Sequence, residues 1–213
     1  MFLALLLAAR IVTFGDSLTA PRPGVITYSE ALQKDLREQG IEVINSAVPG
    51  NTSTQARARF DADVLAKHPD LVIIQLGAND AAIDVWKDPP ATGPRVDIGT
   101  YRDNLGYFVR TLRERNSAVI LMTPNRFAWT PRLRGLYGKP PYSVTSDDGF
   151  NFILDRYSDA VREIARRDNI KLVDAAKAVP ASALLDGMHP NGDGHRIVAG
   201  LLLPLVRVLL KLP

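Results

Sequence analysis

The chain has 213 residues, 46% of them hydrophobic, and its net charge of +3 is too small to indicate nucleic-acid binding. It contains no cysteine, which excludes disulfide bonds, thiolate zinc sites and a cysteine nucleophile. The histidines, His68, His189 and His195, show no metal-ligand spacing, so we expect neither a metal nor another cofactor. The length fits one domain, which we expect to span residues 1–213.

The chain begins with a short apolar run over Phe2–Ala9. It is much shorter than the ~20 residues that span a bilayer, so we expect no integral membrane span. The run has the length of a signal-peptide apolar region, but no basic residue precedes it. Two interpretations of residues 1–9 stay open. They are a signal-peptide remnant of an extracytoplasmic or secreted protein, or an apolar N-terminal extension of a cytoplasmic one.

Apolar runs alternate with amphipathic stretches along the rest of the chain. The runs predict buried strands over residues 11–14, 41–44, 71–76, 118–122 and 170–173. The amphipathic stretches predict helices over residues 28–39, 54–67, 101–115, 150–168 and 197–210, the last in spite of Pro204. Nearly continuous apolar strands are typical of a parallel sheet with helices on both faces. The order predicts an α/β fold, a three-layer α/β/α sandwich with a central, mainly parallel five-stranded sheet.

Two connections are longer than usual and rich in proline and glycine, residues 81–100 and 123–148. Both follow the carboxyl ends of predicted strands, where open α/β sheets place their ligands. We therefore expect these two segments to border a binding site.

Four short motifs follow predicted strands or precede the last predicted helix: Gly15–Thr19, Val48–Thr52, Gly77–Asp80 and Asp186–Pro190. Taken singly, each fits a turn or a helix cap. Together and in this order, they resemble the motifs of the GDSL, or SGNH, hydrolase superfamily. The resemblance covers nearly the whole chain and implies that family's flavodoxin-like fold and a serine ester hydrolase activity.

The resemblance also implies a role for each motif. Ser17 would be the nucleophile, and His189, oriented by Asp186, would take the serine proton and return it to the leaving group. The backbone amides of Ser17 and Gly50 and the side-chain amide of Asn79 would form the oxyanion hole. A neutral amide suits this role because it stabilises developing negative charge without protonating it.

The substrate does not follow from these motifs, because the long connections lie outside them. Asn125, Arg126 and Trp129 follow the fourth predicted strand, where amide, guanidinium and indole groups could bind a sugar; loop packing explains them equally well. We expect a small-molecule ester as partner, with a short acyl group on a polar alcohol such as an acetylated carbohydrate, and no nucleic acid.

Other substrates and another class of protein remain alternatives. The resemblance also allows a lysophospholipase, a thioesterase or an arylesterase. A non-catalytic binding domain of the same fold is remote, because it would be expected to lack a triad or oxyanion residue and none is missing.

Overall fold

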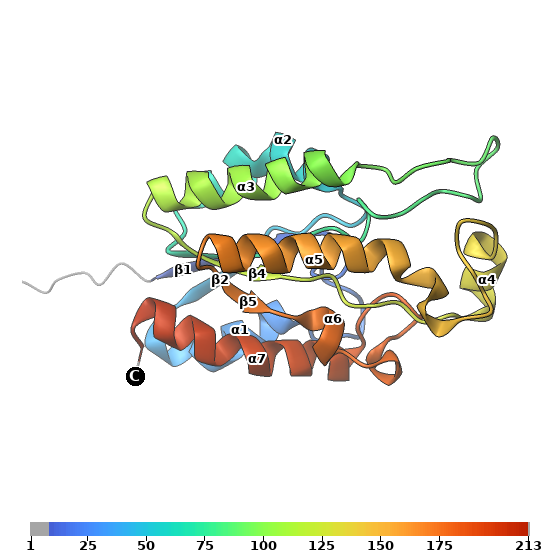
Figure 1. The fold of residues 1–213 in the computed structure, drawn as a ribbon. Coiled ribbons are helices and arrows are strands. Elements are labelled where there is room, and N and C mark those ends of the chain that lie inside the picture. Colours follow the sequence, from blue (N-terminus) through green and yellow to red (C-terminus); the bar gives the residue numbers. More distant parts are fainter. Residues whose placement is uncertain (1–8, 213) are drawn as a thin grey trace, which may run out of the picture.

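The computed structural model describes residues 9–212, whose arrangement is shown in Figure 1. The predicted signal-peptide remnant or apolar extension over residues 1–9 lies outside the described residues, except for Ala9. The Ala9 carbonyl accepts a hydrogen bond from the Glu42 amide at 3.0 Å. Over the range that the structure describes, no helix is long and apolar enough to cross a membrane.

One central sheet contains five strands in the order β2-β1-β3-β4-β5, and every neighbouring pair is parallel. The strands are β1 Arg10–Gly15, β2 Glu42–Asn45, β3 Leu71–Gln75, β4 Ala118–Met122 and β5 Lys171–Val173. The middle strand, β3, is buried at every position because helices cover both faces of the sheet. The predicted sheet is confirmed, and it is parallel throughout.

Helices form a layer on each face of the sheet, which confirms the three-layer sandwich (Figure 1). The longer helices are α1 Tyr28–Leu36, α2 Ser53–Asp63, α3 Ile98–Glu114, α5 Phe152–Arg167 and α7 Gly192–Leu210. On the side of α2, α3 and α5, the rings of Phe14, Phe60 and Phe108 pack together, with centroids 4.7–5.7 Å apart. On the side of α1 and α7, Ile11 packs with Leu32 and other buried aliphatic residues. Burial of this apolar surface is the main stabilising contribution to the sandwich.

Polar caps decide where several helices begin. Thr27 and Thr52 form capping boxes with Glu30 and Gln55, so α1 and α2 start close to their predicted positions. α7 starts at Gly192, well before the predicted residue 197, because the Asn191 side chain accepts hydrogen bonds from the backbone amides of residues 193 and 194. Two short helices, α4 Pro131–Tyr137 and α6 Ala175–Ala178, were not predicted.

The two long connections run over residues 76–97, between β3 and α3, and 123–151, between β4 and α5. The second contains α4 and a short 3₁₀ helix at Asp147–Phe150. Both extend beyond the carboxyl ends of the strands, at the right of Figure 1. The parallel sheet thus brings the ends of β1, β2 and β3 to one edge, and the long connections wall that edge.

Candidate active site

Ser17 lies in a tight turn directly after β1. The Asp16 carbonyl accepts hydrogen bonds from the Thr19 and Ala20 amides at 3.1 and 3.0 Å, and the Asp16 carboxylate accepts one from the Leu18 amide at 2.9 Å. Residue 15 must be glycine, because an added Cβ would lie 2.6 Å from the Gln75 carbonyl oxygen and 2.7 Å from the Thr19 hydroxyl. The turn therefore holds Ser17 at the carboxyl edge of the sheet.

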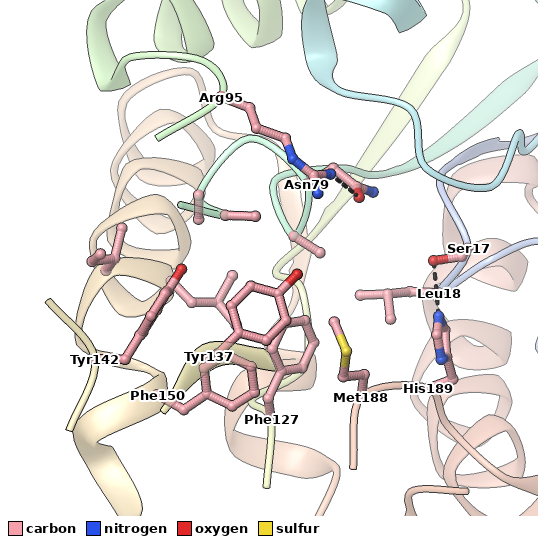
Figure 2. A pocket seen from close by; sticks show the side chains of 15 residues that line it. Ser17, Leu18, Asn79, Arg95, Phe127, Tyr137, Tyr142, Phe150, Met188 and His189 are labelled. Carbon is pink, nitrogen blue, oxygen red and sulfur yellow. Dashed lines mark hydrogen bonds between the residues drawn. The ribbon is translucent and has the colours of Figure 1, made fainter. Parts of the chain in front are cut away.

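His189 and Asp186 lie in the loop before α7 and meet Ser17 from the other end of the chain. His189 Nε2 lies 3.0 Å from Ser17 Oγ (Figure 2). His189 Nδ1 lies 2.8 Å from Asp186 Oδ2. Partial burial acts to raise the pKa of Asp186, but hydrogen bonds from the backbone and ring of His189 outweigh it and the pKa is lowered. An ionised Asp186 holds the ring so that Nε2 can accept the serine proton.

The loop after β2 carries Gly50. It is tied to the turn of the serine by a hydrogen bond from the Val48 amide to the Gly15 carbonyl at 3.0 Å. Gly50 has a φ of +79° and an exposed backbone. The left-handed conformation favours glycine at this position and leaves the amide without a covering side chain.

Asn79 follows β3 and faces the same space as Ser17 (Figure 2). Its Nδ2 donates to Asp16 Oδ2 at 3.2 Å, and its Oδ1 accepts from Arg95 Nη1 at 3.0 Å. One N–H of the Asn79 amide is thus held by Asp16, and among residues 9–212 the second N–H has no hydrogen-bond partner.

Two buried carboxyl groups support this arrangement. Burial raises the pKa of Asp16 to about 7, and the nearby Asp80 adds to the shift. Burial likewise raises the pKa of Asp80, whose carboxylate accepts from the Ser53 amide at 2.9 and 3.0 Å and so fixes the start of α2. Both carboxyl groups organise the backbone around the site.

A pocket opens directly beside Ser17 and His189, and most of its wall is apolar (Figure 2). Leu18 and Met188 lie next to the Ser17–His189 pair, with Asn79 and Arg95 along one side. The remaining lining is alanine, aliphatic or aromatic and comes from the two long connections and the start of α5: Ala78, Ala81, Ala82, Phe127, Tyr137, Tyr142, Phe150, Ile153 and Leu154. An apolar group attached to a carbonyl at Ser17 would be shielded from water here.

The structure does not place the three predicted substrate-binding residues in this pocket. Asn125 is fully buried and donates to the Met188 carbonyl at 2.9 Å, which ties the loop after β4 to the loop of His189. Arg126 forms ion pairs with Asp148 and Asp155 at 2.5 and 3.1 Å. Trp129 lines a separate groove together with Arg126.

The ring of Trp129 lies 4.4 Å from that of Phe150 at an interplanar angle of 12°, and its Nε1 donates to the Ser146 carbonyl at 3.2 Å. The tryptophan therefore supports the wall of the apolar pocket from behind. Sequence analysis missed this because spacing does not tell which face of a loop aromatic is covered. The contact of Arg95 with Asn79 was not predicted either. The sequence pattern does not indicate that residue 95 lies next to the residues where the long connection begins.

Over residues 9–212, no group of three or more histidine or acidic side chains is arranged to hold a metal ion. The described residues place a hydroxyl next to an imidazole–carboxylate pair, and the Asn79 amide lines the same pocket. Acyl transfer uses a nucleophile and a base arranged in this way.

Known proteins resemble the chain in sequence and in structure. The model of the GDSL-like lipase/acylhydrolase family matches residues 13–197. An acetylxylan esterase of Geobacillus stearothermophilus is 30% identical, over 89% of this chain and 90% of its own. The crystal structure of Axe2, an acetylxylan esterase from Geobacillus stearothermophilus, superposes with a TM-score of 0.71 at 27% identity, covering 92% of this chain and 93% of that one. An arylesterase of Vibrio mimicus is 26% identical, over 89% of this chain and 84% of its own.

The family match covers most of the chain and includes the Ser17 turn, Gly50, Asn79 and the Asp186–His189 pair. The fold agrees with that of a solved esterase over 92% of this chain. The chain therefore belongs to the GDSL-like lipase/acylhydrolase family and is a carboxylic ester hydrolase.

Proposed function

We propose that the protein hydrolyses esters in two steps through an acyl-enzyme on Ser17. His189 Nε2 accepts the Ser17 proton as Oγ attacks the ester carbonyl, and the same proton then passes to the departing alcohol oxygen. A water molecule then gives a proton to His189 and attacks the acyl-enzyme, and His189 passes that proton to Ser17 Oγ as the carboxylic acid leaves. The observation that carries this proposal is the continuous hydrogen-bonded chain of 3.0 Å from Ser17 to His189 and 2.8 Å from His189 to Asp186.

The oxyanion formed in each step needs donors on the side away from His189. We assign these to the backbone amides of Ser17 and Gly50 and to the free N–H of Asn79. The assignment is supported by the exposed backbone of Gly50 and by the fixed amide of Asn79. Removing one such donor typically lowers kcat by about 10²–10³.

For the substrate, we propose an ester whose acyl part is an apolar chain or ring longer than acetyl. The supporting observation is the apolar and aromatic lining next to Ser17, from Leu18 and Met188 to Phe150 and Ile153. Each methylene buried in such a pocket gains up to ~0.8 kcal/mol. The similarity to an acetylxylan esterase favours a second candidate, an O-acetyl ester of a carbohydrate. The polar residues that sequence analysis offered for that substrate, Asn125 and Arg126, have other partners.

One set of assays tests the proposal. A fluorophosphonate should label Ser17, and Ser17→Ala should abolish both labelling and hydrolysis, because no other group can form the acyl-enzyme. Ser182→Ala, at an exposed serine, is the matched control and should behave as wild type. Labelling of another serine, or activity retained in Ser17→Ala, would refute the mechanism.

The acyl preference is measured on the wild-type protein with p-nitrophenyl acetate, butanoate and hexanoate, and with an acetylated xylo-oligosaccharide. We expect kcat/KM to rise about tenfold or more from acetate to hexanoate, since four methylenes enter the pocket. Fastest turnover of the acetylated sugar would instead support the carbohydrate candidate and leave the serine mechanism intact.

A further inference from the structure

We propose that Arg95 is a positioning residue for the oxyanion hole. Its guanidinium group holds the Asn79 amide in the orientation that aims an N–H at the reacting carbonyl. The inference rests on the proposed function, because it requires Asn79 to be an oxyanion donor. It adds a residue from the long connection between β3 and α3, outside the four motifs.

The Asn79 amide has a defined partner at each end. Arg95 Nη1 donates to Oδ1 at 3.0 Å, and Nδ2 donates to Asp16 Oδ2 at 3.2 Å (Figure 2 shows the first contact). Rotating the amide by half a turn would set its NH₂ against the guanidinium donors and its oxygen against the carboxyl oxygen of Asp16. The oxygen and nitrogen ends of an asparagine side chain are nearly equal in size, so these two partners decide which end faces Ser17.

Arg95 is itself firmly anchored. Its Nε and Nη2 lie 3.1 and 2.7 Å from Asp84, a carboxylate whose side chain is only 4% exposed. Burial acts to raise the pKa of Asp84, but hydrogen bonds from Arg95 and Lys87 outweigh it and the pKa is lowered. The ionised carboxylate takes two guanidinium nitrogens, and the geometry leaves the third, Nη1, directed at Asn79.

The backbone brings Arg95 back to the beginning of its own segment. The Arg95 amide donates to the Ala82 carbonyl at 3.0 Å, and the Val96 amide donates to the Asp80 carbonyl at 3.2 Å. Residues 80–96 therefore form a closed loop whose two ends lie side by side. The closed loop thus holds the positively charged guanidinium group of Arg95 next to Asn79 Oδ1.

A cation at Oδ1 has two effects on Asn79. It removes the rotational freedom of the amide, so the donor is in place before the reaction begins. It also draws electron density toward Oδ1, which makes the N–H groups stronger donors, as expected for hydrogen bonds in series. A donor fixed and strengthened in this way binds the substrate oxygen more strongly as negative charge develops on it, so Arg95 acts on kcat more than on KM.

The first test compares two substitutions by steady-state kinetics with p-nitrophenyl esters. Arg95→Met should lower kcat about tenfold or more and change KM less than threefold. Lys87→Met is the matched control, because Lys87 also pairs with Asp84, at 2.7 Å, while its amine lies beside the Trp86 ring, away from the pocket. It should leave kcat within twofold of wild type.

A double substitution separates positioning from a general structural role. If Arg95 acts through Asn79, adding Arg95→Met to Asn79→Ala should lower kcat no further, although each substitution alone lowers kcat. Equal losses in both backgrounds would overturn the proposal. So would a rise in KM alone for Arg95→Met, which would make Arg95 a substrate-binding residue. If Asn79→Ala leaves kcat unchanged, Asn79 is not an oxyanion donor. This part of the proposed function then fails, although Arg95 still contacts Asn79 in the structure.

Arg95→Met removes one of the two cations, Arg95 and Lys87, that pair with Asp84. Thermal melting and fluorophosphonate labelling therefore check that the variant is folded. If it does not fold, Arg95→Lys replaces it. The single amine of lysine can compensate Asp84 but cannot also reach Asn79, so this variant should fold and still lose kcat. A folded Arg95→Lys with wild-type kcat would overturn the proposal.

Discussion

At the scale of single residues, His195 shows how burial sets a charge state away from the active site. It lies at the start of α7 with 4% of its surface exposed, and its Nδ1 accepts from the Tyr28 amide at 3.3 Å. Burial lowers its pKa to about 4 from 6.5. In the unfolded chain the imidazole binds a proton below pH 6.5, whereas in the fold it stays neutral until about pH 4. This contribution to stability is therefore complete above pH 6.5 and is lost as the pH falls toward 4.

We expect wild-type protein to lose about 2–3 kcal/mol more of its free energy of unfolding between pH 7 and pH 4.5 than a His195→Asn variant does. Asparagine keeps an acceptor for the Tyr28 amide but does not titrate. Urea unfolding at both pH values measures the difference. His68→Asn is the control, because His68 is exposed and has a φ of +50°, which asparagine tolerates. Equal pH dependence of wild type and His195→Asn would contradict the prediction.

The resemblance of their motifs to a known family predicted Ser17, Asp186 and His189 as a group, and the structure brings the three side chains together. It could not find the partner of Arg126, whose ion pairs depend on where residues 148 and 155 lie in three dimensions. The catalytic roles of Ser17, Asp186 and His189 are those proposed for the acyl-enzyme mechanism.

At the scale of elements, strands were predicted more accurately than helices. Each observed strand lies within a residue or two of its apolar run, and the three inner strands β1, β3 and β4 are almost wholly buried, which leaves a strong signal in the sequence. α4 was missed because it is short and lies among prolines and glycines. α4 depends on Thr130 as its cap and on Pro131 in its first turn. The start of α7 was missed because its first turn, Gly192–His195, carries no apolar periodicity.

Helix α7 continues through Pro204, whose side chain is exposed. Proline has no amide hydrogen, so it cannot donate to the carbonyl of Gly200 one turn earlier. We expect Pro204→Ala to raise the free energy of unfolding by about 1–3 kcal/mol. Gly200→Ala, in the same turn and with open space around the added Cβ, should give a smaller gain of about 0.5–1 kcal/mol. Urea unfolding measures both, and a loss of stability in Pro204→Ala would show that α7 requires its proline.

Across the molecule, the turn after β1 and the loop before α7 carry the reacting groups, and the two long connections form most of the pocket. Residues 76–97 and 123–151 are far apart in the sequence, yet they form facing walls beside Ser17. The alternation of strands and helices predicted the sheet and the edge at which ligands bind. It could not predict the pocket, because long connections without periodicity do not show how they pack against each other.

One hydrogen bond joins these walls directly. The Tyr142 hydroxyl accepts from the Ile83 amide at 2.8 Å, in a buried setting. Tyr142→Phe would leave that amide without its partner, at a cost of about 1–3 kcal/mol, and the walls would separate more easily. A long acyl group contacts both walls, whereas an acetyl group reaches only the region next to Ser17. We therefore expect kcat/KM for p-nitrophenyl hexanoate to fall about three- to tenfold, with that for the acetate within twofold of wild type.

Tyr137→Phe is the matched control for this prediction. Tyr137 is as buried as Tyr142 and packs edge-on against it, with ring centroids 5.6 Å apart. Within the described part of the chain, its hydroxyl has no hydrogen bond that joins the two connections. The control should therefore keep the wild-type ratio of hexanoate to acetate hydrolysis. Equal losses for both esters in Tyr142→Phe would mean that the hydrogen bond stabilises the catalytic loops themselves. An unchanged ratio with unchanged rates would mean that apolar packing alone keeps the two walls together.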